Sequence, residues 1–126
     1  MKLVLIVDDS ESVAASLALA LETISEVQTL IHKDSRTVLE RFEPAEPRVD
    51  ALITDLHLPH ANGLELIRAI RALPAYEALP AILVTADESV KASSKSDTCS
   101  PDAIFHKPFS PKEVCRAVRN ILQLPS

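Results

Sequence analysis

Polar residues that could do chemistry together stand where several apolar runs of the chain end. In chain order they are Asp8, Asp9, Asp55, Thr85 and Lys107. An aspartate in such a place is usually a turn former or a helix cap, so each residue alone means little. Three carboxylates, a hydroxyl and an ammonium meeting at one point would instead form a reactive site. Whether they meet depends on the elements that carry them.

The first of the apolar runs has the composition of a strand that is buried on both faces. Residues 3–7 read Leu-Val-Leu-Ile-Val, a continuous run rich in β-branched side chains. Further strand-like segments follow along the chain, and the predicted strands are 3–7, 27–31, 51–54, 80–85 and 102–105.

Helical spacing of apolar residues separates these strands. The first helix is predicted to begin after Asp9 or Ser10, and the second at Asp34 or Ser35. A third carries Leu64, Ile67 and Ile70. The last has Ser110 as its N-cap, Pro111 in its first turn and Glu113 to complete a capping box. Between them, residues 87–100 have almost no apolar stripe, so a helix there is expected to be short, frayed or ordered by a partner.

Five strands alternating with five helices predict an α/β fold. We expect a doubly wound, five-stranded parallel sheet of flavodoxin-like topology, with strand order 2-1-3-4-5, in a single domain over residues 1–126. Ligands of such sheets bind at the carboxyl ends of the strands, where the five polar residues above are predicted to gather.

Carboxylates gathered at that edge would repel one another unless a cation lies between them. A hard divalent ion such as Mg²⁺ suits carboxylates, waters and a phosphate oxygen. Lys107 and Thr85 can donate to the oxygens of a phosphoryl group. Asp55 beside such a metal, a hydroxyl and a lysine has the surroundings of a carboxylate that accepts a phosphoryl group as an acyl phosphate.

Composition restricts the function further. The formal net charge is −5, which disfavours direct binding to nucleic acid or to anionic lipid. The apolar runs are too short to span a membrane. The chain opens without a basic and apolar leader, and its two cysteines make neither a disulfide framework nor a zinc motif, so a cytoplasmic location is expected.

Three further residues carry expectations. Gly63 is the only glycine among 126 residues, so it is predicted to stand where the backbone tolerates no side chain. Arg68 and Arg71 are predicted to lie on a solvated helix face.

Along essentially its whole length, the chain resembles the receiver domains of two-component response regulators. The motifs that carry the resemblance are Asp8-Asp9, the segment from Asp55 to Gly63 with Pro59, Thr85-Ala86, and Lys107-Pro108-Phe109. The resemblance implies that Asp55 accepts a phosphoryl group from a histidine kinase or phosphotransfer protein. It also implies that Asp8, Asp9, Asp55 and the backbone carbonyl of His57 hold Mg²⁺, and that the Lys107–Pro108 bond is cis.

In such a domain phosphorylation switches a surface formed by the segment 87–100, the fifth strand and the last helix, where an effector domain or partner protein would bind. The family usually has an aromatic residue three positions before its lysine, but here that residue is Ile104. Phe105 should point to the other side of the strand. An atypical output surface is therefore expected.

Two alternative functions also fit the sequence. A pseudo-receiver would bind partners without being phosphorylated, although all five pocket residues are present. An aspartyl-phosphate hydrolase would usually need an acid two residues after its nucleophile, where this chain has His57, and an insertion to enclose its substrate.

Overall fold

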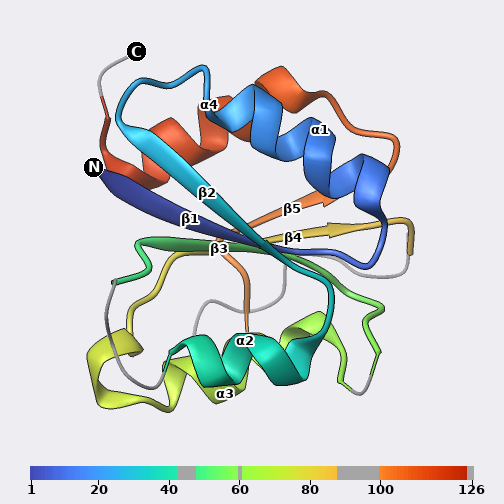
Figure 1. Ribbon diagram of the computed structural model, residues 1–126, viewed down its shortest axis with the longest axis vertical. Helices are drawn as coiled ribbons and strands as arrows, with labels where there is room; N and C mark the ends of the chain where they lie inside the picture. Colours follow the sequence, from blue (N-terminus) through green and yellow to red (C-terminus); the bar gives the residue numbers. More distant parts are fainter. Residues whose placement is uncertain (43–47, 60, 88–99, 125–126) are drawn as a thin grey trace.

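The computed structural model describes residues 1–42, 48–59, 61–87 and 100–124. A five-stranded sheet lies between two layers of helices (Figure 1). Its strands are β1 (Lys2–Val7), β2 (Val27–His32), β3 (Ala51–Asp55), β4 (Ala81–Thr85) and β5 (Ala103–His106). All neighbouring strands are parallel and the order is β2-β1-β3-β4-β5, which confirms the predicted fold class and topology.

The helices cover both faces of the sheet. Helices α1 (Glu11–Leu21) and α4 (Pro111–Leu122) lie on one face, and α2 (Ser35–Arg41) and α3 (Gly63–Arg71) lie on the other (Figure 1). A short 3₁₀ helix, Pro74–Tyr76, follows α3. Helix α4 is the last of the five predicted helices. The helix expected within 87–100 falls almost wholly on residues 88–99, which lie outside the described part of the chain.

Each face of the sheet has its own core because successive strand residues point to opposite sides. In β1, Val4 and Ile6 belong to the core beneath α1 and α4, whereas Leu5 and Val7 belong to the core beneath α2 and α3. All four side chains are fully buried. This two-sided burial explains why the strand is an uninterrupted apolar run.

Local hydrogen bonds fix where the helices begin. Ser10 caps α1 and Asp34 caps α2, as predicted. The capping box expected at Ser110 was wrong, since the Ser110 side chain makes no capping hydrogen bond and only its backbone carbonyl is used. Helix α3 has a capping box that the sequence analysis missed: Asn62 Oδ1 accepts from the Glu65 N–H, and Glu65 accepts from the Asn62 N–H.

Arg71 does not lie on a solvated face, and the prediction for it was wrong. Its guanidinium donates to the carbonyl oxygens of Leu79 (3.1 Å) and Ser100 (2.6 Å) and to a carboxylate oxygen of Asp102 (3.1 Å). The side chain is 11% exposed. Asp102 also accepts from the Ala81 N–H, so this network joins the end of α3 to the starts of β4 and β5.

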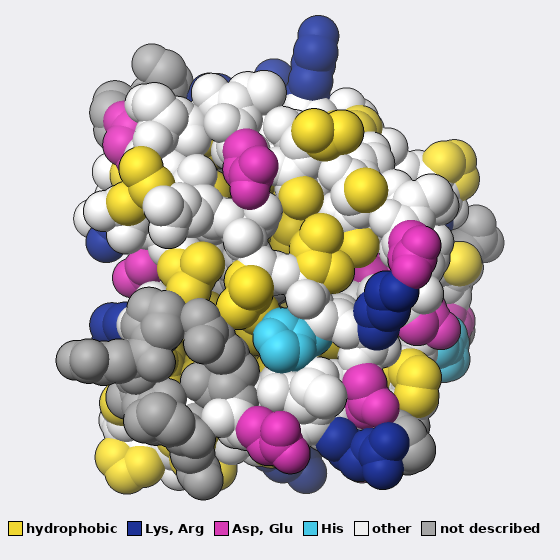
Figure 2. Space-filling model, viewed as in Figure 1, with side chains coloured by type: hydrophobic (Ala, Val, Ile, Leu, Met, Phe, Trp, Pro, Cys, Tyr) yellow, Lys and Arg dark blue, Asp and Glu magenta, His cyan; other side chains and the backbone are white. Residues whose placement is uncertain are grey.

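The surface is charged but mixed. Figure 2 shows Lys and Arg side chains interspersed with Asp and Glu over one face, without a single block of either sign. None of the helices in the described residues is long and apolar enough to cross a membrane.

Candidate functional site

The topology brings two distant acidic residues to one edge of the sheet. Asp8 directly follows β1, and Asp55 is the last residue of β3. The two strands are neighbours, with Val7 paired to Thr54, so the carboxylates project from adjacent positions at the carboxyl ends. Both are nearly inaccessible to solvent, Asp8 being 2% and Asp55 8% exposed.

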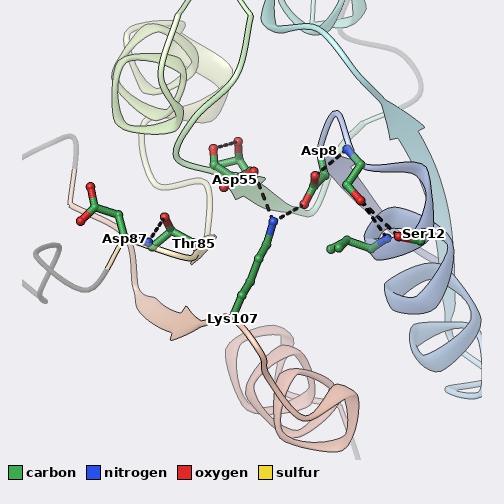
Figure 3. Close-up of polar contacts among 9 residues, drawn as sticks. Asp8, Ser12, Asp55, Thr85, Asp87 and Lys107 are labelled. Atoms are coloured by element: carbon green, nitrogen blue, oxygen red, sulfur yellow. Dashed lines mark hydrogen bonds and ion pairs between the residues drawn. The ribbon is translucent and has the colours of Figure 1, made fainter.

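Lys107 reaches these carboxylates from the other end of the sequence. Its Nζ donates to Asp8 Oδ2 at 3.2 Å and to Asp55 Oδ2 at 3.3 Å (Figure 3). The residue directly follows β5, and its N–H donates to the carbonyl oxygen of Thr85 at 2.8 Å. The Lys107–Pro108 peptide bond is cis, as the resemblance implied.

Asp9 completes a cluster of three carboxylates. Oxygen atoms of Asp8, Asp9 and Asp55 all lie within 4.8 Å of one another, and Asp9 is exposed. Because the carboxylates outnumber the one ammonium group, the pocket keeps an excess of negative charge. All three residues offer hard oxygen ligands, the type that Mg²⁺ prefers, so the donor set fits this ion.

Burial acts in opposite directions on the pKa values of the acidic and basic groups in the pocket. Burial raises the pKa of Asp8 above its ordinary value, although the Ser10 N–H and Lys107 act against this, while the nearby Asp55 adds to it. Burial alone would lower the pKa of Lys107, but the charges of Asp8 and Asp55 and its hydrogen bonds to both outweigh that effect and raise it. Lys107 is therefore held as a cation, while ionised Asp8 is disfavoured by its surroundings.

Thr85 lies at the same edge and bonds Lys107 through its backbone carbonyl, but among the described residues its hydroxyl is not bonded to the carboxylates or to Lys107 Nζ. It is fully buried, and its Oγ1 accepts from the Asp87 N–H at 3.0 Å (Figure 3). The hydroxyl hydrogen is not used by this bond and remains a donor. The exposed His57 side chain lies with Nε2 3.5 Å from an Asp87 carboxylate oxygen, which joins the loops after β3 and β4.

Gly63 stands where no side chain fits, as predicted, but the reason is contact and not a special dihedral angle. A Cβ placed on it would clash with the backbone carbonyl oxygen of Asp55 and lie 3.1 Å from Leu83 Cδ1. Its φ is not positive. The first residue of α3 therefore packs directly on the backbone of Asp55, and its N–H donates to the Leu56 carbonyl oxygen at 2.7 Å.

Supporting hydrogen bonds hold the pocket, and the sequence analysis missed two of them. The buried Thr54 donates to the Asp55 carbonyl oxygen at 2.9 Å, and the buried Ser35 donates to the Pro59 carbonyl oxygen at 3.1 Å. The Ser10 N–H donates to Asp8 Oδ1 at 2.9 Å. The only sign of these bonds in the sequence was Thr54, a polar residue within an otherwise apolar strand.

Comparison with known proteins gives the family. The model of the response regulator receiver domain matches residues 4–119. The chain is 30% identical over 123 residues to the transcriptional regulatory protein TrcR of Mycobacterium tuberculosis, covering 98% of this chain and 46% of the relative. It is 32% identical over 119 residues to the phosphate regulon transcriptional regulatory protein PhoB of Rhizobium meliloti, covering 94% of this chain and 51% of the relative. The chain thus spans about half the length of these relatives.

Solved structures agree with this assignment. A response regulator of Chloroflexus aurantiacus superposes with a TM-score of 0.84 at 30% identity, covering 97% of this chain and 98% of that chain. The chemotaxis response regulator CheY4 of Vibrio cholerae has the same fold, with a TM-score of 0.81 at 24% identity, covering 96% and 98%. The chain belongs to the response regulator receiver domain family. Such domains act in phosphorylation-based signalling and interact with kinases or phosphotransfer proteins.

Proposed function

We propose that the chain, residues 1–126, acts in the cytoplasm as one receiver domain that accepts a phosphoryl group on Asp55. The observation that carries this proposal is the contact of Lys107 Nζ with both Asp8 and Asp55 beside the three-carboxylate cluster. A buried carboxylate next to a fixed ammonium and a divalent-cation site has what phosphoryl transfer requires, namely position and compensating positive charge.

We infer that Asp8, Asp9, Asp55 and the backbone carbonyl of His57 hold Mg²⁺. The three carboxylates lie close enough together to share one ion, and their excess of negative charge favours it. When bound, Mg²⁺ would neutralise charge on these carboxylates and on the oxygens of the phosphoryl group.

The residues of the pocket have distinct roles in the proposed transfer. A carboxylate oxygen of Asp55 attacks phosphorus while the bond from phosphorus to the histidine nitrogen of the donor breaks, and that nitrogen leaves with the electron pair. The product is an acyl phosphate on Asp55. Lys107 donates from Nζ to a phosphoryl oxygen instead of to the Asp55 carboxylate. Thr85 donates the hydroxyl hydrogen that its bond with Asp87 leaves unused.

Thr85 is the residue through which we expect phosphorylation of Asp55 to affect the output surface. Movement of Thr85 towards the phosphoryl group would alter its bond with the Asp87 N–H, at the start of the segment 87–100. We propose that this segment, β5 and α4 form the surface that an effector domain or partner protein binds. Phe105 packs into the core beneath α1 and α4, which leaves Ile104, where the family usually has an aromatic residue, on the opposite face of β5. An atypical output surface follows.

A hollow beside the pocket supports a phosphodonor protein as partner. It has a volume of about 260 Å³ and lies between α1 and the loop that carries Lys107. The residues that line it are Ser12, Val13, Ser16, Lys107, Pro108, Phe109 and Pro111. A helix of a histidine kinase or phosphotransfer protein seated there would lie directly beside Lys107.

The test is incubation with acetyl phosphate or phosphoramidate and Mg²⁺, followed by mass spectrometry of the intact chain. We expect the mass to rise by one phosphoryl group, and the gain to vanish in Asp55→Asn and in the presence of a chelator. Asp34→Asn is the matched control, because Asn caps a helix as well as Asp does and Asp34 lies at the start of α2. It should be labelled like the wild type.

The two alternative functions, a pseudo-receiver and a hydrolase, predict different results in this experiment. A chain that takes up no phosphoryl group under any of these conditions would be a pseudo-receiver. Steady release of phosphate from organic phosphate esters, lost in Asp55→Asn, would identify a hydrolase.

A further inference from the structure

Helices α1 and α4 enclose a second groove, which shares only Pro111 with the hollow beside Lys107. Its volume is about 470 Å³, within the range of ligand-binding clefts. From α1 it is lined by Ala20 and, just beyond the helix, by Thr23. From α4 and the residues after it, it is lined by Pro111, Lys112, Cys115, Arg116, Arg119, Asn120 and Leu124. None of the residues of the phosphoacceptor pocket lines it.

Three cations follow one side of this groove. Lys112, Arg116 and Arg119 have the spacing i, i+4, i+7, which places them in a row of about 10 Å along α4. Within residues 1–42, 48–59, 61–87 and 100–124, no carboxylate pairs with any of the three. A row of unpaired cations is unexpected in a chain of net charge −5.

Arg119 provides a second observation that favours an anionic partner in this groove. In the part of the chain that the structure describes, its Nε is buried and has no hydrogen-bond acceptor. A buried donor left without an acceptor costs about 1–3 kcal/mol. A carboxylate that drew the guanidinium towards it would remove this cost, so the free protein holds Arg119 in an arrangement that an anionic partner would improve.

Apart from the three cations, Thr23 and Asn120, the side chains that line the groove are apolar. Ala20, Cys115 and Leu124 provide a floor of apolar side chains. Leu19, which precedes Ala20 and lies one turn before Thr23, is 73% exposed, an unusually large fraction for a leucine. Apolar surface bordered by one row of like charges is typical of grooves that receive an amphipathic helix.

We propose that this groove binds an acidic amphipathic helix of a partner protein. Apolar side chains of the partner fill the space between α1 and α4, and its Asp or Glu residues pair with Lys112, Arg116 and Arg119. Helix α4 runs along the groove from Pro111 to Leu122, a length of about 17 Å, which corresponds to about 12 residues of a partner helix. Binding here leaves the Asp55 pocket open, so the chain can be phosphorylated while the partner is bound.

The test is selection from a displayed library of random peptides of about 12 residues against the full chain. We expect enrichment of sequences with Leu-like and Asp or Glu residues at helical spacing. A synthetic peptide of the enriched sequence, labelled for fluorescence anisotropy, should bind at least about tenfold more weakly to Lys112→Glu/Arg116→Glu and more weakly at higher salt. Both substituted residues are exposed, so the variant should fold.

The matched control is Lys2→Glu/Arg36→Glu, which makes the same change in net charge at exposed positions outside the groove. It should bind the peptide within about twofold of the wild type. Both double variants should still be labelled on Asp55 by acetyl phosphate. In a Cys99→Ser background, bound peptide should slow the reaction of Cys115 with a thiol reagent, because Cys115 lies in the groove.

Several results would overturn this proposal. They are a library that yields no binder, enriched sequences that are not acidic, equal weakening by the two double variants, and a Cys115 that the bound peptide does not protect. An oligonucleotide of the same charge that competes as well as the peptide would also overturn it, since the groove would then bind anions without regard to an apolar face.

Discussion

At the scale of single residues, Asp8, Asp55 and Gly63 illustrate how closely the pocket is built. Two nearly inaccessible carboxylates share one ammonium, and the backbone of one of them lies against a position that has no room for a Cβ. Changes of one or a few atoms at these positions should therefore have measurable effects.

Gly63→Ala should lower the free energy of unfolding by about 1–3 kcal/mol. The added Cβ would meet the backbone carbonyl of Asp55, which cannot move aside as a side-chain tip can. This cost outweighs the gain of at most about 1 kcal/mol that alanine offers in a helix. Urea unfolding measures the effect, and labelling of Asp55 by acetyl phosphate should also fall. A variant as stable as the wild type would show that the contact relaxes freely.

Asp8→Asn should stabilise the metal-free protein at pH 7 relative to the wild type. Folding raises the pKa of Asp8 above its ordinary 3.8, so the folded state binds this proton more tightly than the unfolded chain does. The contribution of Asp8 is thus most favourable below pH 3.8 and is lost as the pH rises through the folded pKa. Unfolding measured without metal at pH 3.5 and 7 should show the advantage of the variant only at the higher pH.

At the scale of elements, side chains at the ends of helices decide how the helices join the sheet. Helix α3 is fixed at its start by the capping box of Asn62 and Glu65 and near its end by Arg71. Helix α4 begins at Pro111, and the preceding Ser110 gives it no side-chain cap. The two helices should respond differently to the same type of substitution.

Asn62→Ala should lower the free energy of unfolding by about 1 kcal/mol, because it removes the acceptor for the Glu65 N–H. Ser110→Ala is the matched control, and it should cost less than about 0.5 kcal/mol since Ser110 makes no such bond. Chemical denaturation of both variants compares the two caps directly. Equal losses would mean that Ser110 caps α4 in solution.

Arg71→Ala should lower the free energy of unfolding by about 2–3 kcal/mol, because it removes the guanidinium that donates to the Leu79 and Ser100 carbonyls and to Asp102. Arg68→Ala, an exposed arginine on the same helix, should change it by less than about 0.5 kcal/mol. Hydrogen exchange should further show faster exchange of the Ala81 and Asp102 amides in Arg71→Ala, since both lie in this network. Loss of stability equal to that of Arg68→Ala would contradict the role of Arg71.

At the scale of the whole molecule, the pocket couples the ends of three strands. Asp8 follows β1, Asp55 ends β3 and Lys107 follows β5, and these strands are held together only when the sheet is complete. A ligand that binds this pocket binds the folded state alone and must stabilise the whole fold.

Mg²⁺ at one hundred times its dissociation constant should therefore raise the free energy of unfolding by about 2.7 kcal/mol. The gain should be largely lost in Asp9→Asn, because Asp9 is an exposed member of the carboxylate cluster whose removal disturbs no core packing. Asp34→Asn should keep it. Thermal or urea unfolding with and without a chelator measures both, and an equal gain in Asp9→Asn would exclude this residue as a ligand.

Much of this architecture could be predicted from local sequence. The apolar runs marked β1, β3 and β4 because these strands are buried on both faces, whereas the edge strands β2 and β5 are only partly buried and have shorter apolar runs. The chemically distinctive residues stood at the strand ends. The order of the strands along the chain and the handedness of crossovers were enough to predict the topology. The caps at Ser10 and Asp34 were predicted because a cap involves residues only two or three apart.

The contacts that give the protein its chemistry were decided by the tertiary structure. Lys107 and Asp8 are 99 residues apart, and the partners of Arg71 are up to 31 residues away, so no local pattern reveals either contact. The same holds for the clash that excludes a side chain at Gly63 and for the row of cations facing α1. The sequence by itself determined which groups are present and on which elements they lie. Only folding decided which of them are within bonding distance, because that depends on how the layers pack.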